Sequence, residues 1–81
     1  MKFIVKRKLG REIRTRQFNS LYKMCEYLWG KVDFYRKYDG NFYYEIFIED
    51  KAIFYMEKDK PYFEYKSHLI QFMERVVEGG R

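Results

Sequence analysis

The chain has 81 residues, a formal net charge of +5 and a single cysteine, and 22% of its residues are aromatic. A chain of this length forms one domain (1–81) with a small core, and one cysteine excludes an intrachain disulfide or a CxxC metal pair. No apolar run approaches the ~20 residues of a membrane-spanning helix, and the start, MKFIVKRK, lacks the apolar centre of a signal peptide. We therefore expect a cytoplasmic protein with no membrane contact.

Positive and negative charges separate along the chain. Seven cations against Glu12 alone give residues 1–17 a net charge of +6, whereas five acidic residues against Lys51 give residues 39–57 a net charge of −4. A basic end and an acidic middle are typical of a protein that binds its partner in one orientation.

Two β-prone runs at the start of the chain, residues 2–9 and 11–18, predict a hairpin around Gly10. A three-residue turn lets glycine take the left-handed position that is common in such loops. Lys6 then faces Arg14, and the apolar side chains share the other face of the hairpin. The predicted basic face holds Lys2, Lys6, Lys8, Arg14 and Arg16.

Asn19 and Ser20 mark the entry of a helix, because either side chain can cap free backbone N–H groups. The apolar residues at helical spacing are Leu21, Met24, Cys25, Leu28 and Val32. Gly30 leaves two alternatives: a helix that continues to Tyr38, at a cost near ~1 kcal/mol, or a short helix that ends at this glycine. A rival interpretation starts the helix at Arg11.

The short helix is our prediction, because Asp-Gly at residues 39–40 is a strong signal for a tight hairpin turn. It makes residues 32–38 a strand, and residues 31–57 then form a three-stranded antiparallel meander. The long helix stays open as the alternative.

The most aromatic stretch, residues 41–58, consists of two β-prone runs. Alternation along the first run puts Phe42, Tyr44, Ile46 and Ile48 on one face. With a two-residue loop at residues 50–51, Phe47 lies opposite Phe54. The second face then carries Tyr43, Phe47, Phe54 and Met56 among its carboxylates. A solvated sheet face is normally polar, so we favour a cover by the N-terminal segment or a second subunit over an exposed recognition surface.

Pro61 predicts the start of a C-terminal helix, since proline fits the first turn of a helix. The apolar stripe of this helix consists of Tyr62, Tyr65, Leu69, Phe72 and Val76. In an alternative, Ser67 caps a shorter helix and residues 61–65 form an edge strand. Residues 79–80, both glycine, end the helix either way. The fold class is therefore α+β: an N-terminal hairpin, a helix, an antiparallel meander and a C-terminal helix packed on the sheet.

The sequence offers no residue set that is typical of catalysis or of a metal site. His68 is the only histidine, and Cys25 has the apolar neighbours of a buried, inert thiol. An acidic-x-Lys triplet at residues 49–51 is too short a pattern to be specific, and the isolated glycines form no phosphate loop. We expect no enzyme, no metal, no cofactor and no small-molecule substrate.

Binding is the class of function that remains. Short proteins rich in Lys and Tyr are common in AT-rich bacteria and their phages. Our first hypothesis is a phage- or mobile-element-type regulator that docks on a nucleic-acid-processing host protein or complex, for example an anti-CRISPR-like inhibitor of a defence nuclease. The alternatives are a direct DNA- or RNA-binding module that uses the basic ribbon and the sheet aromatics, and a homodimeric interaction protein. The residues assigned to partner or nucleic-acid binding are Lys6, Lys8, Arg11, Arg14, Arg16, Tyr43, Phe47 and Phe54.

Overall fold

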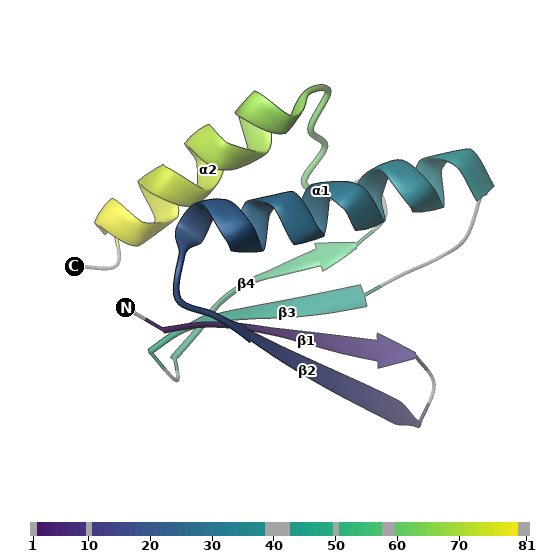
Figure 1. The fold of residues 1–81 in the computed structure, drawn as a ribbon, viewed down its shortest axis with the longest axis horizontal. Coiled ribbons are helices and arrows are strands. Elements are labelled where there is room, and N and C mark those ends of the chain that lie inside the picture. The colour runs from purple at the N-terminus through teal and green to yellow at the C-terminus, as the bar shows by residue number, and fades with distance from the viewer. Residues whose placement is uncertain (1, 10, 39–42, 50, 58–59, 80–81) are drawn as a thin grey trace.

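The computed structural model describes residues 2–9, 11–38, 43–49, 51–57 and 60–79. In this part of the chain four antiparallel strands form one sheet, and both helices lie on the same side of it (Figure 1). The fold is α+β, as the sequence predicted. We name the side of the sheet beneath the helices the helix-side face. The other side, which no described helix or strand covers, is the open face.

The elements follow in the order β1 (Phe3–Leu9), β2 (Glu12–Phe18), α1 (Leu21–Tyr38), β3 (Tyr43–Ile48), β4 (Lys51–Glu57) and α2 (Lys66–Gly79). The strand order across the sheet is β2-β1-β3-β4. Two hairpins therefore lie side by side, and α1 connects them by passing over the sheet (Figure 1). Within the described residues, no helix is long and apolar enough to cross a membrane.

The core lies between the helix-side face and the two helices. The alternation predicted for β3 is confirmed at Tyr44, Ile46 and Ile48, which are all buried, while Phe42 lies outside the described residues. The helices contribute Met24, Cys25, Leu28 and Val32 from α1 and Leu69 and Met73 from α2. The helical spacing of the sequence predicted the four residues of α1.

α1 extends to Tyr38, so the long helix is correct and the strand predicted at residues 32–38 is wrong. Ser20 caps this helix as predicted, because its Oγ accepts a hydrogen bond from the backbone N–H of Lys23 at 3.4 Å. The turn predicted at residues 39–40 lies outside the described residues.

Interactions beyond Gly30 explain why the helix continues through this residue. Val32 is 1% exposed and packs in the core. Lys37 Nζ lies 3.2 Å from Asp33 Oδ2, one helical turn away. Arg36 and Lys37 lie in the last turn, where positive charges interact favourably with the helix dipole. Together these contacts offset the cost of glycine in a helix, ~1 kcal/mol.

The β1–β2 hairpin forms as predicted, but its register differs by one residue. Lys6 lies opposite Thr15 and not opposite Arg14. The observed register puts Phe18 opposite Phe3, on the helix-side face, where Phe18 packs against the core. A slip by one residue moves every side chain of a strand to the other face, so the burial of Phe18 favours the observed register.

The β3–β4 hairpin also has a different register from the predicted one, and a bulge interrupts it between Ile46 and Phe47. Phe54 lies opposite Ile46 rather than Phe47, and the Phe54 side chain lies outside the described part of the structure. Met56, which was predicted on the second face, is 1% exposed and belongs to the core. Burial is again the physical reason, because the bulge allows both Met56 and Ile53 to pack against the core.

α2 begins at Lys66, so the start at Pro61 is wrong and the shorter C-terminal helix is correct, although Ser67 lies inside this helix and does not cap it. Residues 61–65 form neither a helix nor the predicted edge strand. In this segment Phe63 is 4% exposed, and its ring centre lies 5.4 Å from that of Phe72. Because Phe63 reaches into the core, the segment connects the sheet to the helix instead of extending the helix.

Candidate binding surfaces

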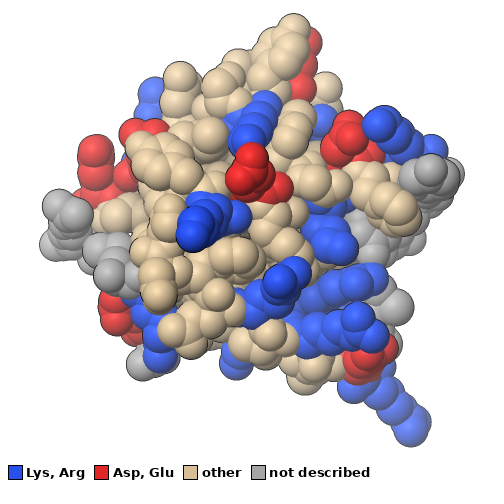
Figure 2. Space-filling model, viewed as in Figure 1, with Lys and Arg blue, Asp and Glu red and all other residues tan. Residues whose placement is uncertain are grey.

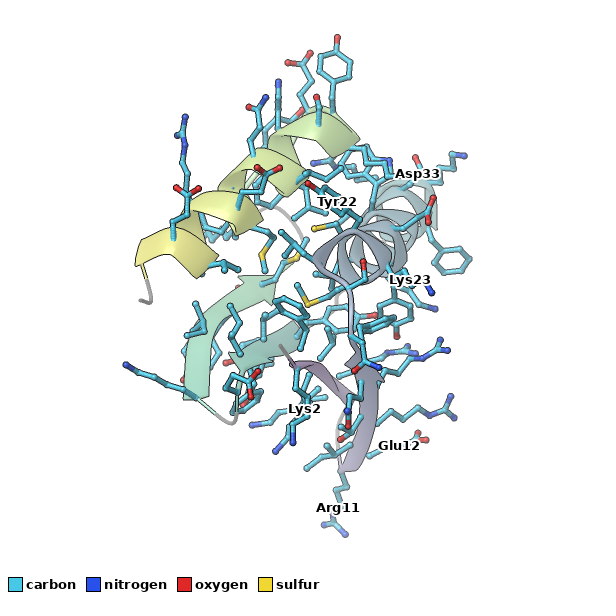
Figure 3. The ribbon with its side chains drawn as sticks, turned by 60° about the vertical axis from the view of Figure 1, so that its left-hand side comes forward. Lys2, Arg11, Glu12, Tyr22, Lys23 and Asp33 are labelled. Atoms are coloured by element: carbon cyan, nitrogen blue, oxygen red, sulfur yellow. The ribbon has the colours of Figure 1, made fainter. Side chains whose placement is uncertain are left out.

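The predicted basic face is not one surface, because the observed register divides its residues between the two sides of the sheet. Lys6 and Lys8 belong to the open face, whereas Arg14 and Arg16 belong to the helix-side face. Arg11 lies in the turn between β1 and β2 and points away from the rest of the molecule (Figure 3). The residues assigned to partner binding therefore form separate sites.

On the helix-side face, basic side chains from β2 and α1 converge on the ring of Tyr27. The guanidinium carbon of Arg16 lies 4.9 Å from the ring centre of Tyr27, and Lys31 Nζ lies 5.6 Å from it. The rings of Phe18 and Tyr27 are 5.4 Å apart. We name Arg14, Arg16, Phe18, Tyr27 and Lys31 the Tyr27 cluster.

Two sequence periodicities assemble this cluster. Arg14 and Arg16 are two residues apart on a strand and share a face, and Tyr27 and Lys31 are one turn apart on a helix and share a flank. Arg7 of β1 is half-buried and lies opposite Arg14. Figure 2 shows that Lys and Arg side chains gather over the β1–β2 part of the molecule.

The Tyr27 cluster carries more positive charge than its carboxylate neighbour balances. Arg14 Nε donates a hydrogen bond to Glu12 Oε1 at 2.8 Å, and this carboxylate raises the pKa of Arg14. Among the described residues, no carboxylate pairs with Arg16 or Lys31. Like charges on neighbouring strands repel each other, and Arg7 lies opposite Arg14, so an anion bound over the cluster would be attracted to it.

The open face carries two of the predicted aromatic residues, but lysine side chains lie over them. Lys6 Nζ lies 4.7 Å from the ring centre of Phe47, and Lys8 Nζ lies 5.9 Å from that of Tyr43. Lys8 also pairs with Glu45, and the hydrogen bond and charge of this carboxylate raise the pKa of Lys8. Lysine stems pack on apolar surface and keep the ammonium group in water. The lysine stems therefore cover part of the open face. The N-terminal segment, which was predicted to cover this face, is instead strand β1 of the sheet itself.

Two larger apolar side chains of the open face remain in solvent, both on the outer strands. Ile13 of β2 is 60% exposed and Tyr55 of β4 is 56% exposed. Tyr55 stacks on the ring of Tyr43 at 5.8 Å, with an angle of 24° between the planes. Phe47 is half-buried under Lys6. The centre of the open face is therefore a solvated layer of charges and not a free stacking platform.

The helical layer carries a third group of side chains, most of them aromatic. The guanidinium carbon of Arg36 lies 4.7 Å from the ring centre of Tyr62 and 5.6 Å from that of Trp29. Tyr62 and Tyr65 are 64% and 59% exposed, and Tyr22, labelled on α1 in Figure 3, is 60% exposed. Tyr, Trp and Arg are the side chains that dominate binding energy at protein interfaces.

The residues considered for catalysis have surroundings that do not favour it. Cys25 is fully buried, and burial raises the pKa of its thiol to about 11, so the thiol is neutral at neutral pH. His68 is exposed and packs edge-on against Tyr65 at 5.3 Å. Glu49 accepts a hydrogen bond from the backbone N–H of Lys2 at 2.6 Å. A search of the described residues finds no group of three His, Cys, Asp or Glu that could hold a metal ion.

Sequence reasoning did not assign Tyr27, Lys31 or Arg7 to a binding surface. On a long helix, Tyr27, Lys31 and Phe34 recur at positions i, i+4 and i+7, which is the spacing of one helix flank. The predicted end of the helix at Gly30 cut this series after its first member.

No protein-family model matches the chain, and neither a characterised protein nor a solved structure is significantly similar to it. The geometry of the three surfaces is therefore the basis for a functional assignment.

Proposed function

We propose that the protein is a small non-catalytic binding protein of nucleic acid, and that the Tyr27 cluster contacts the phosphate backbone. The observation that carries this proposal is the convergence of Arg16 and Lys31 on Tyr27, with Arg14 on the same face of β2. Among the described residues, Glu12 is the carboxylate that forms an ion pair with this group. Lys and Arg side chains that neutralise phosphates release counterions, and this release supplies most of the affinity of non-specific binding. The planar guanidinium group of arginine matches phosphate geometry especially well.

The arrangement of these cations suits a nucleic-acid backbone that runs between β2 and α1. Arg14 and Arg16 are ~6.6 Å apart along their strand, and Lys31 approaches the same ring from the helix. Phosphate contacts position a ligand but carry no sequence information. Three such contacts predict a slope of about −2 for a single strand and about −3 for B-DNA when the logarithm of the binding constant is plotted against the logarithm of salt concentration.

Fluorescence anisotropy with labelled DNA and RNA across a salt series tests this proposal. Arg14→Gln with Arg16→Gln removes two positive charges from the Tyr27 cluster, and Lys6→Gln with Lys8→Gln removes two from the open face. The two variants have the same net charge, so only the position of the lost charges differs. We expect the arginine variant to lose about tenfold in affinity and to depend less on salt, while the lysine variant binds like the wild type.

The reverse ranking of the two variants would contradict the proposal, and so would an absence of binding by the wild type at low salt. Thermal unfolding of both variants is the control for the fold. Arg14 and Arg16 are exposed, so we expect the melting temperature of the arginine variant to stay close to that of the wild type.

A second candidate function is docking on a nucleic-acid-processing host protein, as expected for a phage- or mobile-element-type inhibitor. The contact of Arg36 with Tyr62 and Trp29, next to the exposed Tyr65, favours it, because such side chains anchor protein interfaces. The two functions use different surfaces and can coexist in one protein. In an inhibition assay with a purified RNA-guided nuclease, Tyr62→Ala with Tyr65→Ala should lose inhibition and keep its affinity for nucleic acid.

A homodimer through the open face is not part of the proposal. Lys6, Lys8 and Glu45 belong to the two central strands of this face, and the centres of protein interfaces are depleted in charged side chains. Nucleic acid as a partner agrees with the cytoplasmic location expected from the sequence.

A further inference from the structure

β2 is an outer strand of the sheet, and among the described strands it pairs with β1 alone. In an antiparallel pair, every second residue of a strand turns its backbone N–H and C=O groups away from the neighbouring strand. Residues 12–17 are all exposed, and no described element lies beyond β2 (Figure 1). The outer edge of β2 therefore presents backbone donors and acceptors to the solvent.

The other outer strand, β4, has an edge that is partly occupied. The backbone N–H of Glu57 donates to the carbonyl of Lys60 at 2.9 Å, and the N–H of Lys60 donates to the carbonyl of Glu57 at 3.3 Å. A bulge also interrupts the pairing of β4 with β3, between Ile46 and Phe47. Bulges and covering segments prevent further strands from pairing with an edge. β2 contains no such bulge, because its seven residues pair with β1 in one continuous register.

The side chains of β2 determine which kind of strand fits this edge. Residues 11–17 contain three arginines and one glutamate, so their net charge is +2. Arg14 and Arg16 belong to the helix-side face, and Ile13 and Thr15 belong to the open face. Opposite charges and Thr–Thr pairs that face each other across neighbouring strands stabilise strand pairing. A complementary strand therefore alternates acidic residues with β-branched residues such as threonine.

A second copy of the chain fits this edge poorly. The longest antiparallel overlap of two β2 strands places Thr15 opposite Thr15, and it puts Arg14 of each copy opposite Arg16 of the other. Like charges that lie directly opposite each other destabilise strand pairing. The charge on β2 therefore disfavours self-association and favours an acidic partner.

We propose that the outer edge of β2 binds an acidic peptide in an extended conformation, which adds to the sheet as a further strand beside β2. Main-chain hydrogen bonds supply the affinity in this mode of recognition, and alternate side chains supply the specificity. Arg14 and Arg16 keep their contacts with Glu12 and Tyr27, because their charge acts on the peptide over several ångströms. Peptide binding at this edge uses the backbone of β2 and does not depend on the nucleic-acid binding proposed above.

Hydrogen exchange of the β2 amides, followed by NMR, tests this inference. The probe is an acetylated and amidated hexapeptide that alternates glutamate with threonine. At a peptide concentration tenfold above the dissociation constant, we expect the exchange of the outward-facing amides of β2 to slow about tenfold. The amides of Ile53 and Tyr55 in β4 should exchange as in the free protein. The matched control is the same peptide with D-glutamate, which keeps the charge but loses the regular alternation of side chains along a strand.

Two variants of equal net charge test the role of the arginines. Arg14→Gln with Arg16→Gln should weaken peptide binding about tenfold, the effect of two cross-strand charge pairs. Lys6→Gln with Lys8→Gln should bind the peptide like the wild type. A basic hexapeptide that alternates lysine with threonine should bind more weakly than the acidic one, and equal or tighter binding of the basic peptide would contradict the assignment of an acidic partner.

Several outcomes would overturn the inference. The first is equal binding of the D-glutamate peptide, or bound peptide without slower exchange in β2, because charge alone then explains the binding. Slower exchange in β4 instead of β2, or no binding of the acidic hexapeptide, overturns it too. So does protection of the β2 amides by a second copy, in a protein that sediments as a dimer, or by oligothymidine and not by the peptide. The proposed function is judged separately, by the anisotropy of labelled DNA and RNA.

Discussion

The two faces of the sheet use their basic side chains in opposite ways. On the open face, Lys6 lies over Phe47 and Lys8 pairs with Glu45, so these charges belong to a solvated cover. On the helix-side face, Arg16 reaches the rim of the core without a carboxylate partner among the described residues. Unbalanced charge, and not the number of cations, therefore distinguishes the candidate binding surface.

Neighbouring residues of β3 provide the largest expected contrast between the two faces. Ile46 is fully buried on the helix-side face, and Phe47 is half-buried on the open face. Ile46→Ala should lower the free energy of unfolding by about 3–4 kcal/mol, whereas Phe47→Ala should lower it by only about 1 kcal/mol because much of its surface is already hydrated. Urea unfolding of both variants measures the difference, and equal losses would show that the open face is covered after all.

The thiol of Cys25 gives a second contrast, this time with pH. Burial raises its pKa from 9.0 to about 11, so the folded state holds the proton more tightly than the unfolded chain. The free energy of unfolding is therefore highest below pH 9, and it falls by up to about 3 kcal/mol as the pH rises from 9 to 11. Urea unfolding across this range should show a steeper decline for the wild type than for Cys25→Ala.

A matched control moves the cysteine from the core to the open face of the sheet. In Cys25→Ala with Thr15→Cys, the new thiol is exposed on the open face and should titrate normally and react rapidly with a thiol reagent, while Cys25 of the wild type should react only as fast as the protein unfolds. Rapid modification of Cys25 in the native protein would show that the helix-side core admits solvent.

The smallest of these effects concerns the solvated side of α1. A Cβ at Gly30 would meet nothing within 4 Å, so Gly30→Ala should stabilise the protein by about 0.5–1 kcal/mol through helix propensity. This change corresponds to a rise of a few degrees in melting temperature, about 4–8 °C per kcal/mol. Gly79→Ala, at the last residue of α2, has the same open space and should change the melting temperature less. A lower melting temperature for Gly30→Ala would mean that this side of α1 has a neighbour.

Features set by local contacts could be predicted from the sequence, and features set by distant contacts could not. The alternation that buries Tyr44 and Ile46 and the cap at Ser20 depend on neighbouring residues, and both predictions are confirmed. The registers of the two hairpins depend on burying Phe18 and Met56 in the core that forms once the sheet and the helices pack together, and both were predicted wrongly.

The candidate site shows the same limit. Gly30 and the Asp-Gly pair are strong local signals for the end of a helix, but tertiary contacts of Val32 outweigh them. The error hid the flank on which Lys31 and Phe34 follow Tyr27. Lys6 and Lys8, in contrast, were predicted on the same face as Arg14 and Arg16. The predicted register was wrong by one residue, and such a shift moves the side chains of a strand to the other face.

The most direct test of the account is an amide NMR titration of the protein with oligothymidine, because it reports which face meets the ligand. If the helix-side face binds the ligand, we expect the largest chemical-shift changes at Arg14, Arg16 and Lys31, with those of Lys6 and Tyr55 close to zero. Changes confined to Lys6, Tyr55 and their neighbours on the open face would contradict it.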